Sequence, residues 1–416
     1  MTNETNETFD VAKVKADFPT LDRCQDGKKL VFLDSAASSQ RPRQVLDAMT
    51  SFYETSYANV HRGVYQLAEA STAAFEHARQ TVARFIGAPS PNEVVFTKNA
   101  TESINLVAGS WGRANLGPGD AVVLSLLEHH ANIVPWQMLA AEKGFEIRWI
   151  PLDDEGRLDL TDLDRLLDGA KLLAVTAMSN VLGTITPVHE LAAAAHQHGA
   201  LCLVDACQLV PHLPTDVSAL GADFVAFSGH KMLGPTGIGV LWGRQELLET
   251  MPPFLGGGGM ILNVTTDGFT PDVPPGKFEA GTPPITEAVG LAAAIDYLTD
   301  LGMDAVRRHE VELTSYALRT LHDALGTDLT IHGPSEPAGR GGVLSLALED
   351  VHAHDISQIL DHHAIAVRPG HHCAKPLMRH LNVAATARAS FYIYNDHRDV
   401  DRLAAALVEA RDFFQR

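Results

Sequence analysis

The chain has 416 residues, of which 45% are hydrophobic and 20% are charged. This length permits two domains, and the composition is that of a folded globular protein rather than a disordered one. Acidic residues (51) outnumber lysine and arginine (32), and the resulting net charge of −19 opposes binding to nucleic acid and to anionic membrane surfaces.

The sequence contains no apolar segment of targeting length. Residues 1–15 are polar, without the apolar core of a signal peptide, and no run of about eighteen apolar residues occurs. We therefore expect a cytoplasmic protein without a membrane partner. The cysteines lack C-x-x-C spacing and are too few for a disulfide framework, so at least one of them is a candidate reactive thiol. They are Cys24, Cys202, Cys207 and Cys373.

The first two-thirds of the chain alternates between strand and helix patterns. A short helix ends near residues 17–19, a strand at 30–33 runs into the loop 34–42, and helical periodicity covers 44–57 and 68–86. Strands are then predicted at 93–97, 121–126, 146–150, 172–176, 201–204, 224–227 and 240–242, with helices beginning at 100–103 and covering 136–143 and 188–198. This alternation predicts a mainly parallel sheet, whose ligands bind beyond the carboxyl ends of the strands.

Residues 251–286 break the alternation. They contain four consecutive glycines, Gly256–Gly259, and seven prolines, which indicates an extended excursion across a surface or a subunit boundary. Helices at 287–301 and 305–325 then lead into a smaller unit with strands at 343–348 and 364–368 and a final helix at 398–414. We predict a large domain of residues 25–301 and a small domain of residues 1–24 and 302–416.

Lys231 lies in a glycine-rich turn between the strands at 224–227 and 240–242. A lysine packed against Met232 and Leu233 loses hydration, which favours the neutral amine, a nucleophile toward carbonyl groups. Lys231 could therefore hold an aldehyde cofactor as a Schiff base. The alternative is a solvated turn lysine beside a hairpin.

Three further motifs follow predicted strands. Asp205 ends an apolar strand, where a carboxylate is costly unless it meets a cation such as a protonated pyridine nitrogen, or unless it caps a helix. The loop and helix start at 97–103 could bind phosphate, although capping by Thr101 explains it nearly as well. His129 could stack on a flat aromatic cofactor or be structural.

Cys373 follows a glycine and two histidines in a predicted flexible loop, Arg368–Ala374, an environment that favours the thiolate. A buried, inert cysteine is the alternative. Nearby histidines raise a rival hypothesis, a catalytic zinc site. The stretch His352–Asp355 resembles the His-x-His-x-Asp-His pattern of metallohydrolases but lacks one residue before Asp355, so we predict no metal.

The order of these motifs along the chain resembles the SUF-type (group II) cysteine desulfurases, class V aminotransferase-like pyridoxal-phosphate enzymes of fold type I. The resemblance extends from Leu33 to Ser390. It rests on Glu128–Trp136, Ser179–Thr184, Val204–Gln208, Ser228–Lys231, Phe278–Pro283 and Arg368–Ala374. It implies an α/β fold, with a large domain built on a mainly parallel, seven-stranded type of sheet and a smaller α+β C-terminal domain.

The resemblance also implies roles for individual residues around pyridoxal 5'-phosphate. Lys231 would form the Schiff base, Asp205 would pair with the pyridinium nitrogen, and His129 would stack on the ring. Gln208 would bind the phenolic oxygen, and Asn180, Arg368 and Arg388 would bind the substrate, with Arg388 clamping its carboxylate. Phosphate contacts would come from Thr101, Ser228, His230, position 100 and, from the neighbouring subunit of a homodimer, Thr282. Ala100 replaces a hydroxyl residue of some relatives, which leaves that contact open.

The implied reaction converts L-cysteine to L-alanine and leaves a persulfide on Cys373, which supplies sulfur for iron–sulfur cluster assembly. Cys207 could be a second reactive thiol, but it is expected to pack beneath the cofactor. His354 is expected to contact a zinc-containing SufU-like sulfur acceptor, which is favoured over a SufE-like one. The alternatives are a selenocysteine lyase on the same scaffold, a zinc hydrolase, and a non-catalytic scaffold or sulfur carrier.

Overall fold

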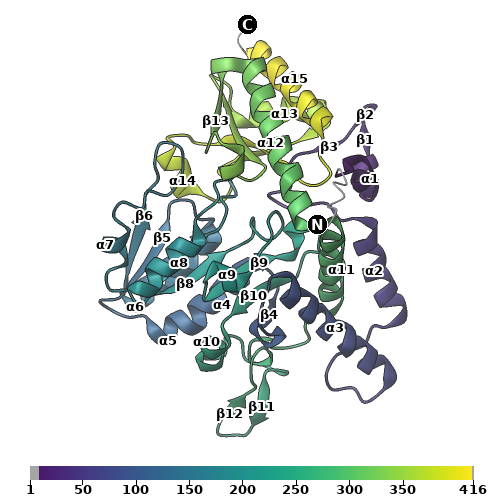
Figure 1. Cartoon of the computed structure of the whole chain (residues 1–416). Helices are drawn as coiled ribbons and strands as arrows, with labels where there is room; N and C mark the ends of the chain where they lie inside the picture. Colours follow the sequence, from purple (N-terminus) through teal and green to yellow (C-terminus); the bar gives the residue numbers. More distant parts are fainter. Residues whose placement is uncertain (1–8, 415–416) are drawn as a thin grey trace, which may run out of the picture.

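The computed structural model describes residues 9–414 (Figure 1). At its centre is a seven-stranded sheet in the order β4-β10-β9-β8-β7-β5-β6. Its strands are β4 (Val94–Thr97), β5 (Ala121–Ser125), β6 (Glu146–Ile150), β7 (Ala170–Thr176), β8 (Leu201–Asp205), β9 (Phe224–Ser228) and β10 (Gly239–Gly243). Only β10 runs antiparallel to its neighbours, so the predicted, mainly parallel sheet is confirmed.

Both faces of this sheet are covered, which is why most of its strands read as continuous apolar runs; the edge strand β6 is partly exposed and carries Glu146 and Arg148. Successive side chains point to opposite faces, so Leu203 and Val204 of β8 belong to different cores. One face is covered by α2 (Arg43–Thr55), α3 (Gln66–Phe85), α8 (Val188–Gln197) and α11 (Ile285–Leu301); the other is covered by α4 (Ala100–Val107), α6 (Val134–Lys143) and α10 (Gln245–Thr250). Truncating one core leucine such as Leu203 to alanine would cost about 2–5 kcal/mol.

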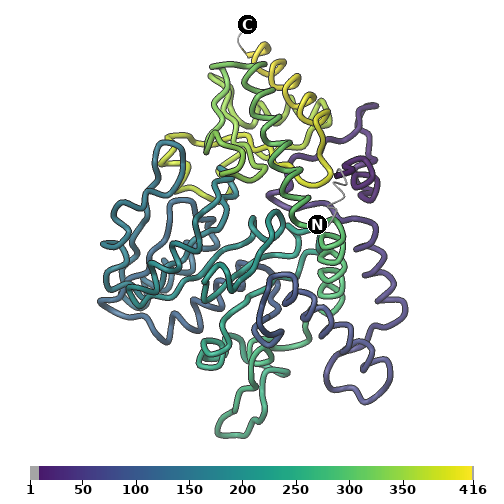
Figure 2. Tube along the Cα trace, viewed as in Figure 1, coloured from purple at the N-terminus to yellow at the C-terminus, as the bar shows by residue number. Residues whose placement is uncertain are grey.

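The Gly/Pro-rich excursion forms a hairpin that projects from the body of the molecule (Figures 1 and 2). It consists of β11 (Ile261–Val264) and β12 (Phe269–Pro271), and it exposes Leu262, Val264 and Phe269. The returning chain is anchored by buried Glu279, which accepts hydrogen bonds from both terminal nitrogens of Arg79 (2.6 and 2.9 Å). The expected excursion is thus present, and its returning segment is bound to α3 through Arg79.

The C-terminal part forms a second, antiparallel sheet of order β13-β14-β17-β16. Its strands are β13 (Leu329–His332), β14 (Val343–Leu348), β17 (Thr386–Ser390) and β16 (Arg368–Gly370). They pack with α12 (Met303–Leu325), α13 (Ala353–His362) and α15 (His397–Phe414) around a separate apolar core.

The single strand predicted at 364–368 is wrong, because the chain changes sheets within it. β15 (Ile365–Ala366) pairs in parallel with β3 (Val31–Phe32), whereas β16 pairs with β17. An apolar run alone does not reveal such a change of partner. Val31 and Leu33 accordingly pack in the C-terminal core. The domain boundaries at residues 24/25 and 301/302 stay a prediction.

The remaining elements are short. They are α1 (Val11–Ala16), α5 (Arg113–Asn115), α7 (Leu163–Leu167), α9 (Val217–Leu220), α14 (Lys375–His380), β1 (Cys24–Gln25) and β2 (Lys28–Lys29). None of the described helices combines the length and the apolar character needed to cross a membrane.

Candidate active site

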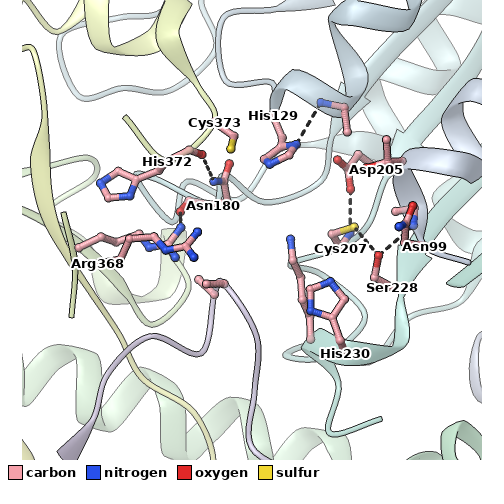
Figure 3. Close-up of a pocket in the computed structure, with 17 residues that line it drawn as sticks. Asn99, His129, Asn180, Asp205, Cys207, Ser228, His230, Arg368, His372 and Cys373 are labelled. Atoms are coloured by element: carbon pink, nitrogen blue, oxygen red, sulfur yellow. Dashed lines mark hydrogen bonds between the residues drawn. The ribbon is translucent and has the colours of Figure 1, made fainter. Parts of the chain in front are cut away.

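A cavity of about 240 Å³ lies where the carboxyl ends of β8 and β9 face the C-terminal unit (Figure 3). Most of the residues predicted from the sequence line it: Ala100, Thr101, His129, Asn180, Asp205, Ser228, His230, Lys231, Arg368, Cys373 and Arg388. The structure therefore brings together motifs that lie far apart along the chain, from Ala100 to Arg388.

Asp205 is the last residue of β8 and is almost fully buried. Its carboxylate accepts a hydrogen bond from the backbone N–H of Cys207 (3.0 Å), and among residues 9–414 no lysine, arginine or histidine forms an ion pair with it. An unpaired buried carboxylate is costly. The site therefore fits a group that brings its own positive charge, such as the protonated ring nitrogen of pyridoxal phosphate.

The amine of Lys231 enters the cavity from the turn after β9. Close by, α4 begins at Ala100, whose N–H donates to Ser228 Oγ (2.9 Å), and Asn99 caps the helix by accepting from the Glu102 N–H (3.0 Å). A Cβ on Gly239 would collide with the Asn99 backbone, so glycine lets β10 approach this helix start. A helix N-terminus beside hydroxyl groups suits a phosphate group.

Burial lowers the pKa of each of the three histidines that line the cavity, His129, His230 and His372. His129 Nδ1 accepts from the Ala131 N–H (3.0 Å), and burial, aided by the Lys231 charge, lowers the pKa of its ring to about 4. Burial, together with the charges of Lys231 and Arg41, lowers the pKa of His230 to about 4 as well. An uncharged His129 ring can lie against an aromatic cofactor without adding a positive charge beside its protonated nitrogen.

Arg388 lines the part of the cavity next to Asn180 and Asp34, and its residue is 1% exposed. Its Nη1 donates to the carbonyl oxygen of Asn180 (2.8 Å), its Nη2 donates to Asp34 Oδ1 (3.0 Å), and its buried Nε has no partner in the described part of the chain. Asp34 also lies 3.5 Å from Arg368 Nε. The two guanidinium groups form a basic end suited to a carboxylate.

Cys373 approaches the cavity from the loop after β16, next to His372, whose carbonyl oxygen accepts a hydrogen bond from Asn180 Nδ2 (Figure 3). It is half-buried, in contrast to Cys207. Burial, reinforced by the nearby Asp205 charge, raises the pKa of the Cys207 thiol far above its ordinary value, which suppresses its thiolate. The geometry therefore favours Cys373 over Cys207 as a nucleophile.

Three predicted residues do not line this cavity. Gln208 is buried below it, where Nε2 donates to the carbonyl oxygen of Ala36 (2.7 Å) and Oε1 has no partner among the described residues. Thr282 is exposed and lines another hollow, with Lys98 and Glu102. His354 lies on α13, in an exposed hollow that also includes Pro369 of β16. The roles of these residues stay predictions.

The histidine pairs do not gather into a metal site. Within residues 9–414, no group of three or more histidine, cysteine or acidic side chains is arranged to hold a metal ion. His352 and His354 stack on each other, and His372 Nε2 instead lies 2.9 Å from Thr386 Oγ1. The zinc hypothesis therefore has no support from this arrangement.

Sequence reasoning assigned no role to three residues at the cavity, Asp34, Asn99 and His372. Asp34 carried a usable signal, because it follows the strand predicted at 30–33 as Asp205 follows the strand predicted at 201–204. The cap Asn99 directly precedes the predicted helix start. His372 carried no distinctive signal, since its contact with Thr386 depends on the pairing of β16 with β17.

Comparison with known proteins gives consistent matches over nearly the whole chain. Residues 31–403 match the model of the family described as "Aminotransferase class-V". The chain is 52% identical to a probable cysteine desulfurase of Streptomyces coelicolor, covering 98% of each chain, and 51% identical to a cysteine desulfurase of Klebsiella pneumoniae, covering 96% of this chain and 98% of the relative.

Solved structures agree. The apo cysteine desulfurase of Thermococcus onnurineus superimposes with a TM-score of 0.91 at 41% identity, covering 97% of this chain and 98% of the other. The Escherichia coli cysteine desulfurase CsdA, in an S-sulfonic acid form, superimposes with a TM-score of 0.88 at 40% identity, covering 98% of this chain and 100% of the other.

Proposed function

The chain belongs to the class-V aminotransferase family and, within it, to the pyridoxal-phosphate-dependent cysteine desulfurases, and we propose that it converts L-cysteine to L-alanine while Cys373 becomes a persulfide. The observation that carries this proposal is the composition of one cavity. It combines the Lys231 amine, the unpaired Asp205 carboxylate, the Arg388 guanidinium and the Cys373 thiol.

Bound pyridoxal phosphate supplies an aldehyde that combines with amines and a ring that takes up negative charge from the substrate α-carbon. Asp205 would keep a proton on the ring nitrogen, which would make the ring a better electron acceptor. His129 would cover the ring, Gln208 would bind its phenolic oxygen, and the residues around the start of α4 would bind the phosphate. The Lys231 amine, when it is not bound to the cofactor, would move the substrate α-proton.

Substrate binding is assigned to the basic end of the cavity. Arg388 binds the carboxylate of L-cysteine, Arg368 adds a second positive charge, and Asn180 completes the contact. This places the substrate sulfur toward Cys373. Support comes from Asn180, whose Nδ2 donates to the carbonyl oxygen of His372 (2.8 Å) and so links the carboxylate end to the cysteine loop.

The sulfur-transfer step then uses the thiolate of Cys373. Its Sγ attacks the substrate sulfur, a sulfur–sulfur bond forms, and the carbon–sulfur bond of the substrate breaks. The electron pair of the broken bond stays with the substrate carbon, which takes up a proton and becomes the methyl group of alanine. One protein thiol and one L-cysteine thus give one persulfide and one L-alanine.

We also propose that the enzyme acts as a homodimer in which Thr282 contacts the cofactor phosphate of the other subunit. Thr282 lies outside its own chain's cavity, and the hairpin before it exposes Leu262, Val264 and Phe269, an apolar surface typical of an interface. Light scattering should give the mass of a dimer, and Thr282→Ala should speed cofactor loss without changing that mass. A monomer that retains its cofactor would contradict this assignment.

As the biological role we propose SUF-type sulfur supply for iron–sulfur cluster assembly in the cytoplasm, with a SufU-like, zinc-containing acceptor. His354 supports this proposal because it lines the same hollow as Pro369, and Pro369 belongs to the segment Arg368–Ala374 that carries Cys373. His354→Ala should abolish stimulation by a SufU-like acceptor and leave the basal rate unchanged. Unchanged stimulation would contradict the assignment.

The central experiment combines spectroscopy with product analysis. The purified protein supplied with pyridoxal phosphate should show a visible absorption band that shifts on adding L-cysteine, and alanine should form. Lys231→Ala should lose this band, whereas Cys373→Ala should keep the band and its shift but form no persulfide. A wild-type protein that stays colourless after addition of pyridoxal phosphate would overturn the proposal.

A further inference from the structure

The turn that carries Cys373 has an unfavourable backbone. It joins β16 to α14, and both His372 (φ +50°) and Cys373 (φ +56°) are in the left-handed region. Side-chain-bearing residues adopt this region at a cost, and two in succession are uncommon. The turn therefore depends on contacts that hold it in place.

Residue His130, on the large-domain side, supplies two such contacts, both to the backbone that directly follows the Cys373 side chain. Its backbone N–H donates to the carbonyl oxygen of Cys373 (2.7 Å), and its ring Nε2 accepts from the backbone N–H of Lys375 (3.0 Å). Within the turn, His371 Nδ1 accepts from the Cys373 N–H (3.1 Å). The ring of His130 is thus the side chain that ties the end of the turn to the large domain.

Acceptance at Nε2 requires a neutral ring whose proton is on Nδ1. Burial lowers the pKa of His130, and the nearby His371 and Lys375 charges lower it further. The charged or titratable groups facing the ring are His129, His371 and Lys375. At neutral pH the ring can therefore accept the Lys375 bond.

We propose that His130 is a positioning residue, whose ring holds the Cys373 turn against the cavity until the thiol must move outward. The inference rests on the proposed role of Cys373 as nucleophile. That role requires two positions of the sulfur, one facing the substrate and one accessible to an acceptor. A single neutral hydrogen bond suits this purpose, because it is weak enough to open during turnover.

The test measures the reactivity of Cys373 in the resting holoenzyme without L-cysteine. Wild type and variants react with limiting iodoacetamide, and mass spectrometry gives the alkylation rates of Cys373 and of exposed Cys24, the internal reference. His130→Ala should raise the Cys373/Cys24 ratio about fivefold, the change expected for one neutral hydrogen bond. His130→Gln, whose side-chain oxygen can also accept from Lys375, should restore the ratio.

His189→Ala is the matched control, because His189 is an exposed histidine on α8. It should leave the ratio unchanged. An unchanged ratio in His130→Ala, or a glutamine variant that behaves like the alanine variant, would overturn the proposal. Alkylation of buried Cys202 would reveal general unfolding instead.

If the alanine variant unfolds, pH decides the question. In wild type the Cys373/Cys24 ratio should rise as acid protonates His130, relative to His130→Gln, which retains the other histidines. Parallel profiles would overturn the proposal. Because no L-cysteine is present, this result is independent of desulfurase activity, which the failure of Cys373→Ala to form persulfide tests separately.

Discussion

Replacement of Arg388 by lysine tests the proposed carboxylate site. In the structure Nη1 and Nη2 each donate one hydrogen bond, to the Asn180 carbonyl oxygen and to Asp34, which leaves the second N–H group of each nitrogen for a carboxylate. Lysine keeps the charge but loses the planar fork, so at least one charge-assisted hydrogen bond is lost. At about 1.5–3 kcal/mol, this loss should lower kcat/KM for L-cysteine by about 10- to 150-fold.

The assay measures L-alanine formation as a function of L-cysteine concentration, with cysteamine as a ligand that has the amine and the thiol but no carboxylate. Cysteamine should shift the cofactor absorption of wild type and Arg388→Lys at similar concentrations. Arg319→Lys, a change at an exposed arginine of α12, is the matched control and should leave kcat/KM unchanged. Equal losses for L-cysteine and cysteamine would refute the carboxylate assignment, because they would indicate general damage to the site.

Three further predictions concern buried titratable or charged groups. Cys207→Ala should retain persulfide formation, measured by mass spectrometry, because burial suppresses the thiolate of Cys207; loss of the Cys373 persulfide in this variant would contradict that reasoning. Glu279→Gln removes one of the two carboxylates that pair with Arg79, the other being Glu76. The loss of one charged hydrogen bond costs about 1.5–3 kcal/mol, so Tm should fall by about 2–3 °C. Replacing Arg79 and Glu279 together by Met and Leu should recover most of this loss, and an unchanged Tm in Glu279→Gln would show that the pair contributes nothing. Burial raises the pKa of Glu128 to about 8, so the folded protein retains a proton that the unfolded chain releases near pH 4.3. The stability of the wild type should therefore fall between about pH 5 and 8 relative to that of Glu128→Gln. Parallel profiles of Tm against pH for the two proteins would contradict this.

The central sheet could be predicted from the sequence because its strands are buried on both faces. Most of them are short apolar runs, and the polar residue that ends several of them, such as Asp205, marks the carboxyl end where ligands bind. Periodicity and strand order were therefore enough to place Lys231, Asp205 and His129 at one edge. The individual roles came from the family resemblance rather than from these patterns.

Features that depend on pairing between distant segments could not be predicted. Nothing local indicates that residues 364–368 divide between two sheets, or that Asp34 meets Arg388 across 354 residues. The same holds for His130, which resembles its neighbour His129 in sequence but contacts the Cys373 turn in space. The proposed contact of Thr282 with a second subunit marks a further limit, because a contact between two subunits cannot be built from the elements of one chain.

The most direct test of the proposed chemistry follows the sulfur atom itself. The holoenzyme is incubated with L-cysteine carrying an isotopic label on sulfur, its thiols are blocked, and its peptides are analysed by mass spectrometry while L-alanine is counted. We expect one labelled sulfur on the Cys373 peptide for each L-alanine formed in the first turnover. A label on another cysteine, or L-alanine formed at the wild-type rate by Cys373→Ala, would contradict the assignment of Cys373 as the nucleophile.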